Sequence, residues 1–167
     1  AILPTNDFFV EIDFNGAEVR TLLGLMEQPQ PSTDVHQFHL DTIFTNLRTR
    51  EESKVAFFAW LYGSKDKTHR DAFHKLELCY DKSRLLEKFY SDNTIRTPYG
   101  KIISNVSSHH ALNYLIQSTA AELTIKQALK IDHFLRESKR NSFLSFIIHD
   151  SVVLDMKKAD LDLLKPL

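Results

Sequence analysis

The chain has one cysteine, four glycines and five prolines among its 167 residues. A single cysteine excludes a disulfide bond within the chain. No run of about 20 apolar residues is present, so the sequence predicts no membrane-spanning helix. It also contains no internal repeat and no low-complexity segment. The hydrophobic content of 43% therefore indicates one folded domain with a core of its own.

Two acidic residues follow apolar segments that have the composition of strands. Residues 8–12 (FFVEI) lead into Asp13, and residues 143–148 (FLSFII) lead into His149–Asp150, with a returning strand at 152–154. A carboxylate at an apolar strand end is costly to bury unpaired, and two such carboxylates side by side repel each other. A divalent cation that prefers oxygen ligands, such as Mg²⁺, removes both costs. Taken singly, Asp13 is equally explained as a turn or cap residue, and His149–Asp150 as an ordinary hairpin turn.

The spacing Arg50-x3-Lys54-x7-Tyr62-Gly63 places two cations and the aromatic rings of Phe58 and Tyr62 along one side of a helix. Cations at a helix start oppose the helix dipole, which is unfavourable unless an anion docks there. A nucleoside triphosphate is such an anion. The alternative is a surface helix whose lysine and arginine are solvated.

Periodicity and turn residues predict helices and strands in alternation, with the strands far apart in the sequence. Thr49 and Glu52 form a capping box that starts the helix over 50–62, and Gly63 is a suitable end for it. The other expected helices cover 17–27, 34–47, 70–91 and 107–137, with a short helical end at 159–164, short strands on either side of a turn at 97–100, and a hairpin around Asp150. This mixture favours an α+β fold.

Four of these segments together resemble the palm and fingers of a family A DNA polymerase, the class of bacterial polymerase I and many phage replicases. The similar segments are DFNGAEVRTLLGL (13–25) for the first palm motif, the spacing over 50–63 for the fingers helix, NYLIQSTAAEL (113–123) for the helix between them, and IIHDSVVLD (147–155) for the second palm motif. The resemblance implies a small antiparallel palm sheet backed by helices, with an inserted helical fingers subdomain. The implied boundaries are palm 1–33, fingers 34–95 and palm 96–167, with thumb and exonuclease segments expected outside this chain.

The resemblance implies template-directed transfer of a dNMP to a primer 3′-hydroxyl, with two Mg²⁺ ions as cofactors. Asp13 and Asp150 are then the metal ligands, the backbone carbonyl of Phe14 is a third ligand, and Lys54 is a candidate general acid for pyrophosphate release. The implied partners are primer–template DNA and dNTPs, with no membrane, in the cytoplasm of a bacterial or phage-infected cell. The net charge of −1 predicts that this chain alone binds DNA weakly, because affinity for DNA comes largely from Lys and Arg.

The same resemblance implies a nucleotide site on the helix over 50–62. Arg50 and Lys54 are expected to hold the β- and γ-phosphates, Phe58 to lie against the sugar, and Tyr62 to lie near the templating position or the nascent base pair. Glu18 is expected to pack on Tyr62 and to exclude a ribose 2′-hydroxyl, unless it is simply a solvent-facing helix residue. In this family a phenylalanine at the position of Phe58 goes with discrimination against dideoxynucleotides.

Three more residues are expected to contact DNA. Asn113 and Gln117 share a helix face and match residues that contact template and primer backbone, although internal hydrogen bonding is an alternative. His149 is expected near the primer-terminal phosphate. Three positions depart from the family pattern. Gly16 stands where many relatives carry glutamine, Ser151 where many carry glutamate, and His109 where a primer-side arginine is common.

Three other functions compete with this interpretation. A single-subunit RNA polymerase shares the two aspartates and often has the sequence His-Asp-Ser found at 149–151, but Glu18 argues against it. A non-catalytic palm fragment for assembly or DNA docking would not need both aspartates. A metal phosphohydrolase using His149–Asp150 would need more histidine ligands. A zinc site at His36 and His39 would lack a third ligand in the sequence.

Overall fold

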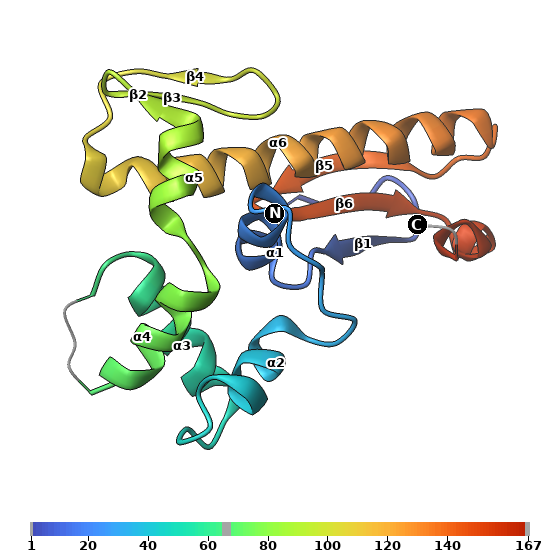
Figure 1. The fold of residues 1–167 in the computed structure, drawn as a ribbon. Helices are drawn as coiled ribbons and strands as arrows, with labels where there is room; N and C mark the ends of the chain where they lie inside the picture. Colours follow the sequence, from blue (N-terminus) through green and yellow to red (C-terminus); the bar gives the residue numbers. More distant parts are fainter. Residues whose placement is uncertain (1, 65–67, 166–167) are drawn as a thin grey trace. The chain divides into compact units, whose positions relative to one another are not determined.

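The computed structural model describes residues 2–64 and 68–165, and these form two compact units. We call Ala1–Asn15 together with Ala120–Leu167 the sheet unit, and Gly16–Thr119 the helix-rich unit. Both units combine helices with short antiparallel strands, so the predicted α+β class is confirmed (Figure 1). Within the described residues, no helix has the length and apolar character needed to cross a membrane.

The sheet unit is built on a three-stranded antiparallel sheet in the order β1-β6-β5. β1 spans Phe8–Asp13, β5 spans Phe143–Ile148 and β6 spans Ser151–Met156. All six residues of the central strand β6 are buried between its two neighbours, and these include the polar Ser151 and Asp155 as well as four apolar residues. The predicted strands and the hairpin that joins the last two are confirmed.

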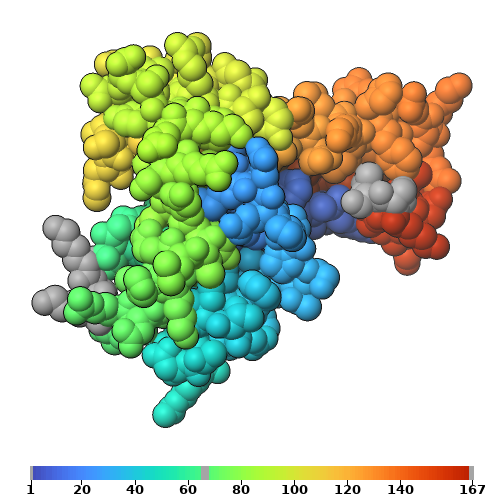
Figure 2. Space-filling model, viewed as in Figure 1, coloured from blue at the N-terminus to red at the C-terminus, as the bar shows by residue number. Residues whose placement is uncertain are grey.

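One face of this sheet is covered by the second half of α6, which spans Ser108–Glu137 (Figure 1). The buried core between them contains Ala128 and Leu135 of the helix with Val152, Leu154 and Met156 of the central strand, and it is closed by Leu163 of the 3-10 helix Lys158–Leu164. In the space-filling view, the orange side chains of α6 lie directly against the red end of the chain (Figure 2).

Two buried acids connect segments of the sheet unit by hydrogen bonds. The Asp155 carboxylate accepts hydrogen bonds from the backbone N–H groups of Thr5 (2.6 Å) and Asn6 (2.8 Å), which ties down the segment before β1. Asp160 accepts a 2.7 Å bond from the Ser142 hydroxyl, and this bond joins the start of β5 to the terminal 3-10 helix. Buried carboxylates are tolerated where they are hydrogen-bonded in this way.

The helix-rich unit packs its helices around a second core. The elements are α1 (Ala17–Leu25), α2 (Val35–Thr42), α3 (Arg50–Leu61), α4 (Arg70–Cys79), α5 (Lys82–Phe89), the start of α6, and a small sheet of β2 (Tyr90–Ser91), β3 (Thr94–Arg96) and β4 (Ile102–Ile103). Phe57 of α3 is fully buried at the centre of this core, and His39 stacks on it at 4.6 Å between ring centroids. Burial lowers the pKa of His39 to about 4, so its ring is neutral at pH 7.

α3 begins as the sequence predicts. The Thr49 side chain accepts from the Glu52 backbone N–H, and the Glu52 carboxylate reaches back to the Thr49 N–H, so the capping box is formed. Gly63 follows the helix with φ +79, a left-handed conformation that glycine adopts without strain.

The single helix predicted over 70–91 is wrong, because the structure contains two helices there. Tyr80 is extended between them, and its buried hydroxyl shares a 2.6 Å hydrogen bond with Nε2 of His39. Asp81 then caps the next helix by accepting from the Arg84 N–H. A tertiary anchor followed directly by a new cap therefore ends one helix and begins another.

The helix predicted over 34–47 is also shorter than expected. α2 ends at Thr42, and Ile43 and Phe44 turn into the core, where Phe44 is fully buried. Burial of these two side chains outweighs continuation of the helix.

Candidate functional site

Both predicted metal ligands lie at one end of the sheet unit. The register of β1 against β6 sets Asp13 directly opposite Ser151, and Asp150 is the residue before Ser151 in the hairpin turn. Asp13 is exposed and Asp150 is half-buried. The Ser151 hydroxyl donates a 3.0 Å hydrogen bond to Oδ1 of Asp13. Register fixes this juxtaposition, since a slip of one residue would turn the Asp13 side chain to the other face.

The donor set at this end of the sheet consists of oxygen atoms. Two accessible carboxylates and the nearby carbonyl of Phe14 fit a hard cation such as Mg²⁺, which keeps several of its own waters. No group of three or more His, Cys, Asp and Glu side chains suited to a metal occurs among the residues that the structure describes. His149, in the same turn, is exposed and has a left-handed backbone conformation with φ +52.

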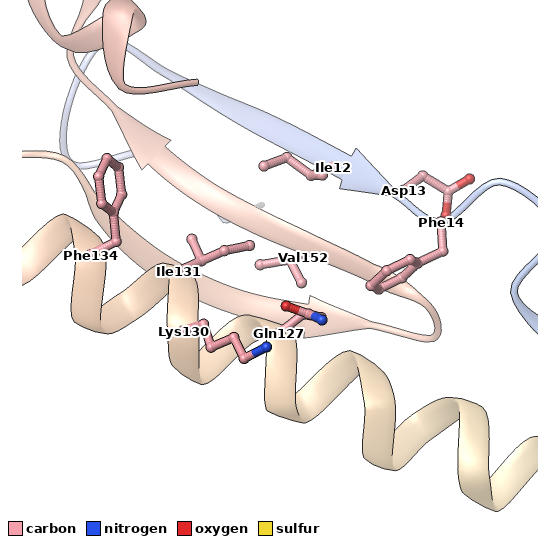
Figure 3. Close-up of a pocket in the computed structure, with 8 residues that line it drawn as sticks. All are labelled: Ile12, Asp13, Phe14, Gln127, Lys130, Ile131, Phe134 and Val152. Carbon is pink, nitrogen blue, oxygen red and sulfur yellow. The ribbon is translucent and has the colours of Figure 1, made fainter. Parts of the chain in front are cut away.

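A cavity of about 490 Å³ opens beside Asp13 in the sheet unit (Figure 3). Its walls come from the end of β1, from β6 and from one face of α6, and the lining residues are Ile12, Asp13, Phe14, Gln127, Lys130, Ile131, Phe134 and Val152. No motif in the sequence predicted this cavity. The signal was the spacing of Gln127, Lys130, Ile131 and Phe134, which places them on one side of a helix.

Three predicted nucleotide and DNA residues meet in the helix-rich unit. The Tyr62 hydroxyl, just after α3, donates a short hydrogen bond to Oε2 of Glu18 on α1. Gln117 of α6 donates from Nε2 to Oε1 of the same carboxylate, at 3.4 Å. Burial, together with the bond to Glu18, raises the pKa of Tyr62, so the phenol remains a neutral donor. Glu18 is therefore held by two partners rather than pointing freely into solvent.

Phe58 lies next to this cluster and stacks on Tyr62. Their ring centroids are 5.9 Å apart with an angle of 16° between the planes, and both rings are half-buried. Phe57 and Trp60 are buried in the core, at 0% and 3% exposure, as predicted for the other faces of the helix. α3 thus presents a partly accessible pair of stacked rings one turn apart.

Arg50 is engaged by an acid that the sequence analysis missed. Its guanidinium makes a two-pronged pair with Asp34, at 2.9 Å from Nε and 2.8 Å from Nη2, and a 2.5 Å bond to Glu51. Asp34 also caps α2 by accepting from the N–H groups of His36 and Gln37. The Arg50 hydrogen bond is the largest cause that holds the pKa of Asp34 well below its usual range. The position of Asp34, directly before the helix that begins at Val35, could have predicted its capping role but not its pairing with Arg50.

The remaining predicted residues differ in their surroundings. Lys54 is exposed one turn after Arg50. Asn113 is half-buried, and its Oδ1 is a buried acceptor with no hydrogen-bond partner among the described residues. Gln117, four residues on, is exposed apart from its bond to Glu18. The predicted residues therefore divide between the units, with the two acids, Phe14 and His149 in the sheet unit and all others in the helix-rich unit.

Gly16, one of the three departures from the family pattern, has a structural reason. It precedes α1 with φ +65, and a Cβ at this position would lie 2.8 Å from Cγ1 of Val35. A side chain is therefore opposed both by the backbone conformation and by the close approach of α2.

No protein-family model and no curated protein matches the sequence. Among solved structures, the chain is similar to the POL domain of Pol1 from M. smegmatis, determined in complex with DNA primer-template and dNTP. The TM-score is 0.72 at 20% sequence identity, and the similarity covers 95% of this chain and 35% of that chain. The fold of this chain is therefore that of part of a DNA polymerase domain, as its four motifs predicted.

Proposed function

We propose that the chain is the palm and fingers part of a family A DNA polymerase, which transfers a dNMP from a dNTP to a primer 3′-hydroxyl on a DNA template. The observation that carries the proposal is the register of β1 against β6, which brings the ends that bear Asp13 and Asp150 together. The similarity in fold to a polymerase domain supports it. In this proposal residues 1–33 and 96–167 are palm and residues 34–95 are fingers.

Asp13 and Asp150 supply carboxylate oxygens for two Mg²⁺ ions, and the Phe14 carbonyl supplies a third ligand group. When bound, the two ions activate the attacking hydroxyl and stabilise the leaving pyrophosphate. The protein's own part is to hold the acids at one strand end and to present them to solvent, where substrate can reach them.

Arg50 and Lys54 bind the triphosphate in this proposal. Both are at the N-terminal end of α3, where backbone N–H groups add to the positive potential. Arg50 must exchange Asp34 for phosphate oxygens, or bind both, because its guanidinium is already paired. Lys54 gives its proton to the departing pyrophosphate.

Phe58 lies against the sugar of the incoming nucleotide, and Tyr62 lies near the templating position or the nascent base pair. Aromatic faces bind nucleotides without reading their sequence. Glu18 excludes a 2′-hydroxyl, and its bonds to Tyr62 and Gln117 support this role because they restrict the carboxylate. Asn113, Gln117 and His149 contact the DNA backbone in this proposal, with side-chain N–H groups donating to its oxygen atoms.

The test is Mg²⁺-dependent primer extension, comparing the wild-type chain with Asp150→Ala and with Asp162→Ala as a matched control. Asp162 is an acid of the same unit that pairs with Arg140 at the surface, so its loss should leave extension unchanged. We expect dNTP incorporation that Asp150→Ala abolishes. Because the chain corresponds to part of the matched domain, dNTP binding is measured in parallel, with Arg50→Ala expected to weaken it. Absence of both incorporation and dNTP binding, or extension that survives Asp150→Ala, would contradict the proposal.

A single-subunit RNA polymerase is the second candidate, favoured by the sequence His149–Asp150–Ser151. The contact between Glu18 and Tyr62 argues against it, since an RNA polymerase must admit the 2′-hydroxyl. Incorporation of NTPs in preference to dNTPs in the same assay would move the assignment to RNA synthesis.

A further inference from the structure

A buried serine faces one of the two acids at the end of the sheet unit. Ser151 is 5% exposed, whereas Asp13 opposite it on β1 is exposed. Residues directly opposite in an antiparallel pair have side chains on the same face, about 4.5–5.5 Å apart at Cβ. The 3.0 Å bond from the Ser151 hydroxyl to Oδ1 of Asp13 follows from this register.

We propose that Ser151 is a positioning residue, which holds the Asp13 carboxylate in the orientation that binds a divalent cation. The inference rests on the proposed function, in which Asp13 is a metal ligand. It assigns a role to a position where the family pattern has a glutamate and where this chain has a neutral hydroxyl.

An exposed carboxylate such as that of Asp13 has conformational freedom. An aspartate at a strand end can rotate about two bonds, and binding a cation requires that this freedom be lost. Ser151 is fixed by burial between two strands, so its single donated hydrogen bond fixes the carboxylate before a cation arrives. Oδ2 and the second lone pair of Oδ1 remain available as ligands. Groups that orient metal ligands in this way commonly change metal affinity by about 10–100-fold.

A hydroxyl differs from the usual glutamate in charge. Glutamate at position 151 would add a third negative charge beside Asp13 and Asp150, whereas serine adds a donor. We therefore expect Ser151 to act on cation affinity through orientation, and we expect its effect to be reproduced by threonine but not by alanine.

The chain offers a matched control in Ser142. This serine is also buried in the sheet unit, at 3% exposure, and its hydroxyl donates to Oδ2 of Asp160 at 2.7 Å. It precedes β5, whereas Ser151 follows that strand's hairpin turn, so the length of a six-residue strand, roughly 20 Å, separates the two pairs. Removal of either hydroxyl deletes one serine–aspartate bond, but only Ser151 is next to the acids. The Ser142 hydroxyl also accepts a 3.0 Å bond from the Lys157 N–H, so its removal is the more severe test of general destabilisation.

The experiment measures binding of Mn²⁺ to the 167-residue chain by titration of the free-ion EPR signal, with thermal unfolding of every variant recorded alongside. We expect Ser151→Ala to weaken Mn²⁺ binding about tenfold, the low end of the range for such groups. Ser151→Thr should retain binding within about twofold on the same scale. Ser142→Ala should lower the melting temperature and leave Mn²⁺ affinity unchanged.

The outcomes separate this inference from the proposed function. Mn²⁺ binding that is lost in Asp13→Ala but is equal in wild type and Ser151→Ala would overturn the positioning role alone. Equal loss in Ser151→Ala and Ser142→Ala would also overturn it, because the effect would then be general destabilisation. Mn²⁺ binding that is unaffected by both Asp13→Ala and Asp150→Ala would overturn the proposed metal site, and the positioning role with it.

Discussion

Asp34 contacts the starts of two helices, α2 and α3. Substitutions of Asp34 can separate the contribution of a helix cap from that of an ion pair. One oxygen caps α2 by accepting from two backbone N–H groups, and both oxygens accept from the Arg50 guanidinium at the start of α3. Asp34→Ala deletes the cap and the ion pair together. Asp34→Asn keeps a good capping side chain and deletes the charge.

The expected magnitudes follow from the exposure of these groups. Loss of the cap costs about 1 kcal/mol. The side chains of Arg50 and Asp34 are 38% and 23% exposed, so the pair belongs with surface ion pairs of good geometry, and it contributes about 0.5–1 kcal/mol. We therefore expect the free energy of unfolding to fall by about 1.5–2 kcal/mol in Asp34→Ala and by about 0.5–1 kcal/mol in Asp34→Asn.

Urea unfolding at several pH values tests this reasoning. The pKa of Asp34 is depressed in the folded state, so the ion pair contributes fully above its ordinary value of about 3.9 and is lost as the pH falls through the folded value. The difference between wild type and Asp34→Asn should therefore shrink below about pH 4. Glu51→Ala is the control. The Glu51 side chain also accepts from Arg50 but is 70% exposed, so its removal should change the free energy of unfolding little. Equal losses in Asp34→Ala and Asp34→Asn would refute the separate role of the cap.

Two further substitutions test the local geometry. Gly16→Ala should lower the free energy of unfolding by about 2–4 kcal/mol, because it combines left-handed backbone strain with a 2.8 Å approach to Val35. The control is Gly100→Ala, which has φ +93 and no described atom within 4 Å of the added Cβ, so it should show the backbone strain alone. An equal loss of stability at both positions would contradict the close contact at Gly16. Glu18→Ala should raise the ratio of rNTP to dNTP incorporation by about ten- to a hundredfold if the carboxylate excludes the 2′-hydroxyl, whereas Glu18→Gln should keep the exclusion. An unchanged ratio in Glu18→Ala would remove the steric role.

Elements with strong local signals could be predicted from the sequence. The helix at Arg50–Leu61 begins with a capping box, and the strands at Phe8–Asp13 and Phe143–Ile148 are mainly apolar segments that lead to Asp13 and Asp150. In each case neighbouring residues contain the information. The break between α4 and α5 could not be predicted, because helical periodicity continues through it. It depends on the bond between Tyr80 and His39, which are 41 residues apart.

The candidate site shows the same division between local and tertiary information. The resemblance led to the prediction that Glu18 packs on Tyr62, and the structure contains that contact. It did not lead to Asp34 as the partner of Arg50, since nothing in the spacing of α3 indicates an acid 16 residues earlier. A contact between residues of the recognised motifs could therefore be predicted from the sequence, whereas a contact made by a residue outside the motifs, such as Asp34, could be found only in the structure.

Two of the departures from the family pattern, Gly16 and Ser151, have different structural surroundings. At Gly16 the backbone is left-handed, and Val35 occupies the space that a side chain at this position would need. A glutamine at position 16 would therefore require a shift of α2 as well. At Ser151 the strand register is kept, and a shorter side chain still reaches Asp13 by a hydrogen bond. A contact made by a glutamine at position 16 is therefore excluded by this packing, whereas Ser151 contacts the first acid by a hydrogen bond. It follows that the proposed metal site and the segment before α1 depend on different contacts, because the first is set by the pairing of β1 with β6 and the second by the packing of Val35 of α2 against Gly16.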